Sequence, residues 1–310
     1  MRRPRSTPAG QHRPVLLQEV LDILAPQPGD VVVDCTIGWA GHSVELLKRV
    51  GSSGKLIGID MDAENLQHAR ERLSELAFPF ALHHGNFAGL PAILAAEGAM
   101  TVAAVLADLG MSSMQVDDPE RGFSYVREGP LDMRMDRGRG KTAAQLLQTL
   151  PEEEIRRALA ELGDEPQAKA IAAAIVAARG KTPLQRTTDL ARLILGRQGK
   201  DAWRLHPSRE RWNTHPAART FQALRILVNR ELPNLEQLLR VLPSCLQAQA
   251  TVAIISFHSG EDRLVKTAFR NGQRGGIYSE AADEPIRASF AEKTANPRSR
   301  SAKLRWAKRA

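Results

Sequence analysis

The chain has 310 residues, of which 43% are hydrophobic and 25% charged, and its net charge is +8. This is the composition of an ordinary folded protein, and it excludes a low-complexity or disordered chain. The length exceeds that at which one core tends to divide, so we expect two domains or one domain with an insertion. Cys35 and Cys245 lie far apart without metal-ligand neighbours. We therefore predict neither a disulfide framework nor a metal site, and a reducing cytoplasm fits.

Basic residues gather at residues 1–13, 134–141 and 296–310. Such clusters attract polyanions, RNA or DNA first, although a generally basic surface is the plainer alternative. In the last cluster, Trp306 among Arg and Lys suits phosphate contact with base stacking, whereas a further strand is the other interpretation. The first cluster lacks the apolar core of a signal peptide, and no apolar run is long enough for a bilayer span. We predict no membrane association.

From about residue 30 to 110, short β-rich runs alternate with helical ones. This rhythm predicts a parallel sheet with crossover helices, and ligands then sit at the carboxyl ends of the strands. The strand-like runs are 31–35, 55–60, 80–87 and 102–110, and the helix-like runs between them are 42–50 and 63–76.

After residue 112 the rhythm gives way to a loop rich in Gly, Pro and charge, followed by helical spacing at 155–162 and 171–178. A long amphipathic helix is predicted from about 216, with Phe221 and Leu232 on one face. The sheet resumes at 251–257, an apolar run typical of a buried parallel strand. We predict a discontinuous α/β domain and an inserted helical domain. Their residues are 1–112 with 216–310, and 113–215.

The segment "DCTIGWAGHS", residues 34–43, joins the first strand to the first helix. A dinucleotide site needs the spacing G-x-G-x-x-G, but this loop offers only Gly38 and Gly41. The missing third glycine weakens the case for a nicotinamide-binding site. A ligand without phosphates, such as S-adenosylmethionine, can bind through main-chain groups. Asp34 could help to order the loop.

Three further residues follow the ends of the next strands. Asp60 is placed to accept both ribose hydroxyls of a nucleoside. Phe87 could cover an adenine face, although a Phe here is more often part of the core. Asp108 ends the fourth strand beside the same edge, whereas Asp62 is predicted to cap a helix. Together these residues predict a nucleoside-binding α/β enzyme.

With these residues the sequence resembles the bacterial 16S rRNA cytosine-N4 methyltransferase family, called RsmH or MraW. The resemblance covers nearly the whole chain and rests on seven blocks in order. They are "RPVLLQEV" at 13–20, "DCTIGWAGHS", "DLGMSSMQVDDPERGFSY" at 108–125, "GPLDMRMD" at 129–136, "HPAARTFQALRILVN" at 215–229, "SFHSGEDRLVK" at 256–266 and "NPRSRSAKLR" at 296–305.

The resemblance implies a class I S-adenosylmethionine-dependent methyltransferase fold, Rossmann-like with a mostly parallel sheet, interrupted by an all-helical domain on the substrate side. It implies methylation of a cytidine in the P-site decoding region of 16S rRNA within the small ribosomal subunit. It also implies a cofactor site. In that site Ala40, Gly41 and His42 would hold the methionine end, Asp60 the ribose and Phe87 the adenine side, while Asp108 and Gln115 would complete the pocket.

Two positions depart from the family pattern. Ala40 stands where the family usually has Gly, and if this position needs positive φ, its Cβ costs about 1 kcal/mol. This departure is the only support for a rival function, an RNA-binding ribosome-assembly factor with little catalysis. Gly260 stands where Leu is common, which affects packing and no cofactor contact. The sequence leaves open whether the protein forms a homodimer.

Three further hypotheses concern chemistry. Asp108 accepts a proton from the cytosine amino group, or it only orients the cofactor. In 129–136, Asp132, Arg134 and Asp136 line the cytidine entry path, or they form an internal ion pair. The run "SFHSGEDR" suggests a hydrolase only weakly, because no nucleophile elbow is present; a helix cap is the preferred interpretation.

Overall fold

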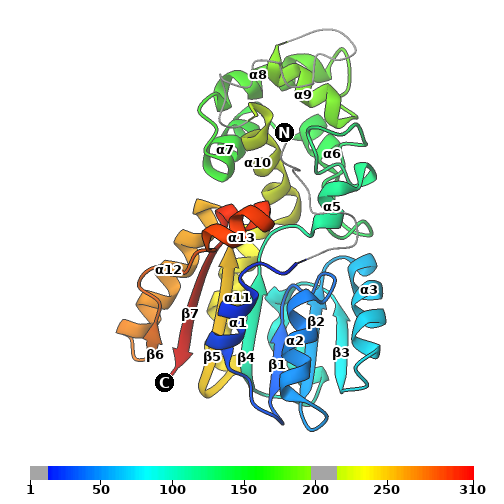
Figure 1. The fold of residues 1–310 in the computed structure, drawn as a ribbon. Coiled ribbons are helices and arrows are strands. Elements are labelled where there is room, and N and C mark those ends of the chain that lie inside the picture. Colours follow the sequence, from blue (N-terminus) through cyan, green and yellow to red (C-terminus); the bar gives the residue numbers. More distant parts are fainter. Residues whose placement is uncertain (1–12, 197–214) are drawn as a thin grey trace. The chain divides into compact units, whose positions relative to one another are not determined.

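The computed structural model describes residues 13–196 and 215–310, so the predicted basic N-terminal segment lies outside the described residues except for Arg13. The chain divides into two compact units (Figure 1). Of the described residues, 13–110 and 232–310 form the α/β unit, and 111–196 with 215–231 form the helical unit. The second boundary therefore follows the helix that begins near residue 216, whereas the sequence placed it before that helix.

The α/β unit is built on a seven-stranded sheet with the order β3-β2-β1-β4-β5-β7-β6. The first five strands are parallel, and β7 runs antiparallel to β5 and to β6. The predicted α/β class with a mostly parallel sheet is thereby confirmed. The strands are β1 (Val31–Asp34), β2 (Lys55–Asp60), β3 (Phe80–His84), β4 (Val102–Asp108), β5 (Leu246–Ser256), β6 (Tyr278–Ala281) and β7 (Lys303–Arg309).

Helices cover both faces of this sheet because successive strand residues point to opposite sides. Val32 and Leu106 belong to one core cluster, whereas their neighbours Val33 and Val105 belong to the other. The first cluster packs α1 (Leu17–Leu24), α2 (Gly41–Val50) and α3 (Ala63–Ser74). The second packs α4 (Leu90–Ala96), α11 (Glu231–Cys245) and α12 (Ser259–Arg274). Short elements complete the unit: η1 (Phe87–Gly89), α13 (Phe290–Ala295) and η4 (Pro297–Ser301).

The C-terminal basic segment supplies strand β7 and is not a free tail. Arg305 is buried, and its Nε donates to Oδ1 of Asp262 at 2.7 Å, while Nζ of Lys303 donates to Oδ2 of the same carboxylate at 2.8 Å. Trp306 is half-buried in the sheet and pairs with Ala253 of β5. The strand interpretation of residues 303–309 is therefore confirmed, and phosphate contact by the half-buried cations of this segment stays a prediction.

The helical unit has its own apolar core, formed around α7, α8 and α10. Both predicted helical stretches, 155–162 and 171–178, are confirmed. The long helix ends earlier than predicted, because Arg230 has φ 51° and closes α10 at Asn229, so Leu232 is not on it. The elements are α5 (Ser113–Asp117), η2 (Pro119–Arg121), α6 (Ala143–Thr149), α7 (Glu152–Gly163), α8 (Ala168–Arg179), α9 (Thr187–Leu195) and α10 (Ala217–Asn229). In neither unit is a described helix long and apolar enough to cross a bilayer.

Residues 129–136 are tied into the helical unit. Arg134 donates from Nε and Nη2 to the two oxygens of Asp132, at 2.7 and 2.9 Å. The Asn229 side chain accepts from the Met135 backbone N–H and donates to the Met133 carbonyl. The predicted internal ion pair is therefore present. The predicted position of these residues on the cytidine entry path stays a prediction.

Gly129 provides a stability test of this packing. A Cβ at this position would lie 1.8 Å from the carbonyl oxygen of Pro119, whereas a Cβ on Gly180 would meet nothing within 4 Å. We expect Gly129→Ala to lower the free energy of unfolding by about 1–3 kcal/mol through overpacking. Gly180 has φ −74°, so Gly180→Ala should raise it by about 0.4–1 kcal/mol. Urea unfolding of both variants measures this, and equal stabilities would contradict the prediction.

Candidate functional site

Three carboxylates end adjacent parallel strands at one edge of the sheet. Asp60, Asp34 and Asp108 are the last residues of β2, β1 and β4, which are neighbours in the sheet. All strands here run in the same direction, so the three side chains share the carboxyl edge, where α/β proteins bind ligands.

The loop between β1 and α2, residues 35–40, lies over this edge. The Ile37 N–H donates to the Ile59 carbonyl at 2.9 Å, and the Gly38 N–H donates to Oδ2 of Asp60 at 2.8 Å. On the other side, the Trp39 ring lies 4.2 Å from the His68 ring. Both the adjacent strand and α3 therefore fix the loop.

Ala40, one of the two predicted departures from the resembled family, adopts the left-handed conformation with φ 59° and ψ 30°. Its N–H donates to the Ile37 carbonyl and its carbonyl accepts from the Val44 N–H, so the turn into α2 forms normally. The Cβ costs about 1 kcal/mol in this conformation. Because the methyl group is fully buried, it recovers a similar amount, about 0.8 kcal/mol. The chain therefore tolerates alanine at a position that favours glycine.

Asp34 is buried beneath the loop. Its Oδ1 accepts from the Thr36 N–H at 3.1 Å, and its Oδ2 accepts from Oγ of Ser43 at 2.7 Å. Burial raises the pKa of Asp34 to about 6, and these hydrogen bonds only partly oppose that shift. Asp34 therefore orders both ends of the loop, as the sequence suggested.

Asp60 also holds the loop, in addition to its predicted ribose contact. Besides Gly38, it accepts from the Asp62 N–H at 2.8 Å and from Nδ2 of Asn65 at 3.2 Å. Burial raises the pKa of Asp60 to about 6. A carboxylate has about four acceptor sites, so these bonds use much of its capacity. Asp62 caps α3 by accepting from the Glu64 N–H, as predicted.

Asp108 is distinct because one of its carboxylate oxygens lacks a partner. Its backbone N–H donates to Oγ1 of Thr36 at 2.7 Å, but Oδ1 is buried without a hydrogen bond among the described residues. Burial, followed by the charges of Asp34 and Glu261, raises the pKa of Asp108 well above its usual value. Buried polar atoms are nearly always hydrogen-bonded, so an unpartnered carboxylate oxygen at the ligand edge indicates a ligand group.

His42 lies between Asp108 and the N-terminal segment. It is buried, its Nε2 lies 2.9 Å from the Val15 carbonyl oxygen, and its Nδ1 lies 3.7 Å from Oδ2 of Asp108. A carbonyl only accepts, so Nε2 carries a proton. The His42 ring therefore connects residue 15 to the site, and its predicted cofactor contact stays a prediction.

Phe87 and Gln115 each have a structural role within their own unit. Phe87 lies half-buried in η1 and packs against the second core cluster. Gln115 belongs to the helical unit, where its Oε1 accepts from the Ser112 N–H and closes a capping box at α5. Their predicted cofactor contacts stay predictions.

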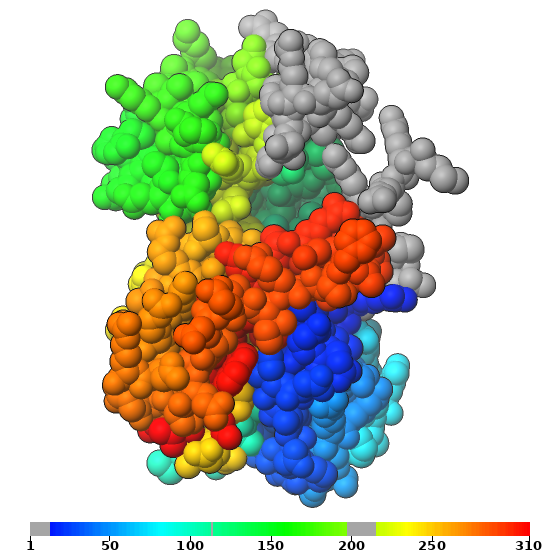
Figure 2. All heavy atoms as spheres, turned by 60° about the vertical axis from the view of Figure 1, so that its left-hand side comes forward, coloured from blue at the N-terminus to red at the C-terminus, as the bar shows by residue number. Residues whose placement is uncertain are grey.

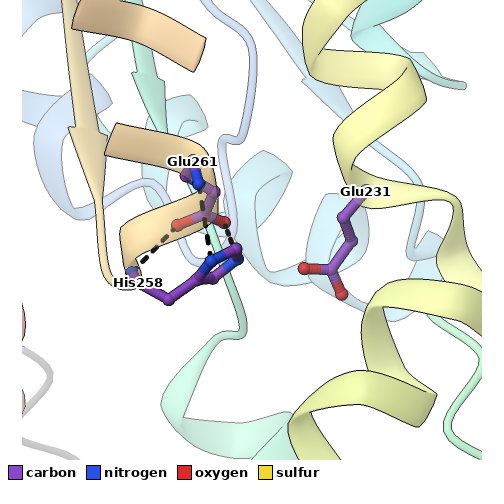
Figure 3. Close-up of side chains that lie close together, drawn as sticks. All are labelled: Glu231, His258 and Glu261. Atoms are coloured by element: carbon purple, nitrogen blue, oxygen red, sulfur yellow. Dashed lines mark hydrogen bonds and ion pairs between the residues drawn. The ribbon is translucent and has the colours of Figure 1, made fainter. Parts of the chain in front are cut away.

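The "SFHSGEDR" segment caps α12, as expected, although the capping residue is His258. Nδ1 of His258 accepts from the Glu261 N–H at 3.4 Å, and Oε2 of Glu261 accepts from the His258 N–H at 3.3 Å (Figure 3). Gly260 makes room for this ring, because a Cβ there would lie 3.2 Å from it. The presence of Gly260 where Leu is common therefore affects local packing.

The described residues of the α/β unit fit S-adenosylmethionine. No side chain caps the N-terminus of α2, so the first N–H groups of that helix suit the carboxylate of a methionine end. The free Oδ1 of Asp108 suits an N–H group. Asp60 already accepts from Gly38, Asp62 and Asn65, so it has about one acceptor site left for a ribose hydroxyl. Each part of the site therefore complements a part of this cofactor.

Comparison with known proteins agrees with this site. The model of the MraW methylase family matches residues 9–310. The chain belongs to this family. Three relatives are named ribosomal RNA small subunit methyltransferase H: one from Alkaliphilus metalliredigens, designated H 2, one from a Geobacter species and one from Citrifermentans bemidjiense. They are 44%, 44% and 45% identical to this chain; the alignments cover 97%, 95% and 95% of it and 86%, 97% and 97% of the relatives.

Family membership confirms the predicted resemblance and, with the observed sheet, the class I methyltransferase fold. Sequence reasoning missed the supporting residues Thr36, Ser43 and Asn65, whose backbone or side-chain groups donate to the carboxylates. Thr36 and Ser43 stand inside the quoted loop motif, and for Thr36 a hydroxyl two residues after a strand-end Asp was the available signal. Asn65 had no such signal.

Asp34 allows a test of pH-dependent stability. Its pKa rises from about 3.9 in an unfolded chain to about 6 here. The stability associated with its neutral form is thus complete below about pH 4 and is lost as pH rises through 6. Asp34→Asn stays neutral, so its free energy of unfolding should fall by less than that of the wild type between pH 4 and 7. The two falls in the free energy of unfolding should differ by at most about 3 kcal/mol.

The exposed Asp22 on α1 supplies the control. Asp22→Asn should keep the wild-type pH profile of unfolding. If Asp34→Asn also keeps that profile, Asp34 does not titrate as inferred.

Proposed function

We propose that this protein transfers a methyl group from S-adenosylmethionine to N4 of a cytidine in the 16S rRNA of the small ribosomal subunit. The observation that carries this proposal is the buried, unpartnered Oδ1 of Asp108 at the carboxyl edge of the sheet. Family membership and the names of the relatives support the cofactor and the class of RNA. Small subunits assemble in the cytoplasm, and we expect the protein to act there.

The reaction needs alignment more than strong activation. The bound cofactor would supply a sulfonium methyl group that is already activated for transfer. The amino group of cytosine is a poor nucleophile because its lone pair is delocalised into the ring. Holding the nitrogen in line with the methyl carbon can therefore supply much of the rate enhancement.

The end of the β1–α2 loop, the start of α2, the end of β2 and η1 would provide this alignment. We assign the methionine end to the main chain of Ala40, Gly41 and His42, the ribose to Asp60 and the adenine side to Phe87. Gly38 and Asp60 are already hydrogen-bonded to each other, so the loop is ordered before the cofactor arrives. Preorganisation of this kind lowers the entropic cost of binding.

Asp108 would accept the amino proton. As the new N–C bond forms and the C–S bond breaks, the nitrogen becomes positively charged and must lose a proton. Oδ1 of Asp108 has a free acceptor site, and burial, with the charges of Asp34 and Glu261, raises the pKa of this carboxyl, which makes its ionised form a stronger base. The alternative role, orientation of the cofactor alone, predicts a loss of affinity instead of a loss of rate.

Methyl transfer to small subunits tests the proposed function. Subunits from cells that lack this methylation would be incubated with the protein and labelled S-adenosylmethionine, and their nucleosides analysed by mass spectrometry. We expect N4-methylcytidine as the labelled product. Tight subunit binding without any labelled nucleoside would instead support the assembly-factor function, and methylation of a different atom would contradict the N4 assignment.

Asp108→Asn separates the two roles of this residue. The amide keeps the shape but cannot accept the proton, so we expect kcat to fall by about 10²- to 10⁴-fold. The Kd for S-adenosylmethionine, measured by calorimetry, should change only a few-fold. Full turnover with normal cofactor affinity would exclude Asp108 as the base, and a loss confined to affinity would assign it to cofactor orientation.

A further inference from the structure

The N-terminal segment of the described chain meets residues 286–301, which precede β7, on one face of the α/β unit. The Leu16 N–H donates to Oε1 of Glu292 at 2.9 Å, and Nδ2 of Asn296 donates to the Arg13 carbonyl at 3.1 Å. Figure 2 shows this arrangement: the blue N-terminal segment lies against the orange-red segment near residue 290. We call the face formed by Arg13, Arg287, Phe290, Lys293 and Arg300 the terminal surface.

Phe290 is the unusual residue of this surface. Its relative exposure is 84%, although it is a large aromatic side chain on an ordered helix, α13. Lys293 follows at the i+3 position and therefore lies on the same side of the helix. Nε of Arg300 donates to the Lys293 carbonyl at 3.4 Å, which places a second cation beside the first.

The charge of the terminal surface is strongly one-sided. Residues 286–301 contain four cationic side chains and one acidic side chain, Glu292. Glu292 is turned toward the N-terminal segment, where it accepts from the Leu16 N–H. Arg13, Arg287 and Arg300 are exposed. An exposed aromatic ring thus lies among cations, a combination that suits a polyanion with flat, stackable groups.

The terminal surface lies at the same edge of the sheet as the candidate site. Lys303, the first residue of β7, pairs with Ser256, the last residue of β5, so the segment before β7 is at the carboxyl edge. The N-terminal segment also reaches the site directly, through the Val15 carbonyl and His42. A nucleic acid bound here would therefore run toward the methyl-transfer site within one rigid unit.

We propose that the terminal surface binds a single-stranded segment of the substrate RNA, with Phe290 stacked on a base and Arg287, Lys293 and Arg300 on phosphates. This inference rests on the proposed function for the identity of the RNA. A membrane surface would also accept cations and an exposed ring. The position of this surface at the carboxyl edge that carries the candidate site favours the substrate RNA, and stacking on a base then explains the exposed ring. Arg13 extends the same surface at the N-terminal side.

Two variants with matched controls test this surface. The first pair is Phe290→Ala against Met100→Ala; Met100 is 89% exposed but precedes β4, at the opposite edge of the sheet. The second pair is Arg287→Glu with Arg300→Glu against Arg270→Glu with Arg274→Glu. Arg270 and Arg274 are exposed near the end of α12, which begins at the carboxyl edge and ends away from it.

The first readout is binding of a fluorescein-labelled 12-nucleotide single-stranded RNA at several salt concentrations. Phe290→Ala should weaken binding about tenfold, within the range for one base stack. The Arg287/Arg300 double variant should weaken it at least tenfold and reduce the slope of log K against log salt by about 1.4, since each phosphate contact contributes about 0.7. The two control variants should bind like the wild type.

The second readout uses small subunits in the methyl-transfer assay. Both terminal-surface variants should raise KM for subunits while kcat and the Kd for S-adenosylmethionine stay unchanged, which also shows that the variants are folded. Equal losses in the test and control variants would indicate a general charge effect and overturn the proposal, as would unchanged RNA binding. The RNA-binding assay needs no catalysis, so failure of the proposed methyl transfer would be seen separately in the wild type.

Discussion

The hydrogen bonds between the β1–α2 loop and the strand-end carboxylates are the constraint on which the site depends. Asp34 and Asp60 each accept from main-chain N–H groups of this loop or the turns beside it. Burying these carboxylates is unfavourable, and their pKa values rise to about 6 as a result. Ordering this loop, which has little regular structure of its own, therefore lowers the stability of the protein.

Asp108 is a third buried carboxylate at this edge, but its hydrogen bonds are incomplete. Thr36 holds its backbone, yet its side chain has no donor for Oδ1 among the described residues. In the two loop-ordering carboxylates, hydrogen bonds within the unit offset part of the cost of burial. In Asp108 that compensation is missing, and a ligand can supply it. Their hydrogen bonds thus distinguish the loop-ordering carboxylates Asp34 and Asp60 from Asp108, the proposed proton acceptor.

The sequence predicted the sheet well because strand runs of β-branched and apolar residues are short, buried and regularly spaced. β2, for example, coincides with the predicted 55–60. The break after α10 was missed because Arg230 carries no sign of its left-handed conformation, unlike a glycine. The carboxylates were found because they end strands, but Asn65 was not, since its role depends on folding α3 back over Asp60. Spatial partners of this kind have no local pattern.

The terminal surface shows that tertiary structure decides which basic residues of the sequence remain exposed. Basic residues with Trp306 predicted RNA contact by the C-terminal segment, but strand pairing buries Arg305 and places Trp306 in the sheet. Backbone pairing of β7 with both neighbours outweighs the preference of these charges for water, and Asp262 offsets part of the cost of burial because it accepts from both Lys303 and Arg305. The cations that remain exposed lie before the strand, around Phe290. Charge composition therefore predicted an RNA partner, whereas the pairing of β7 leaves the cations and the aromatic ring before the strand exposed for the proposed contact.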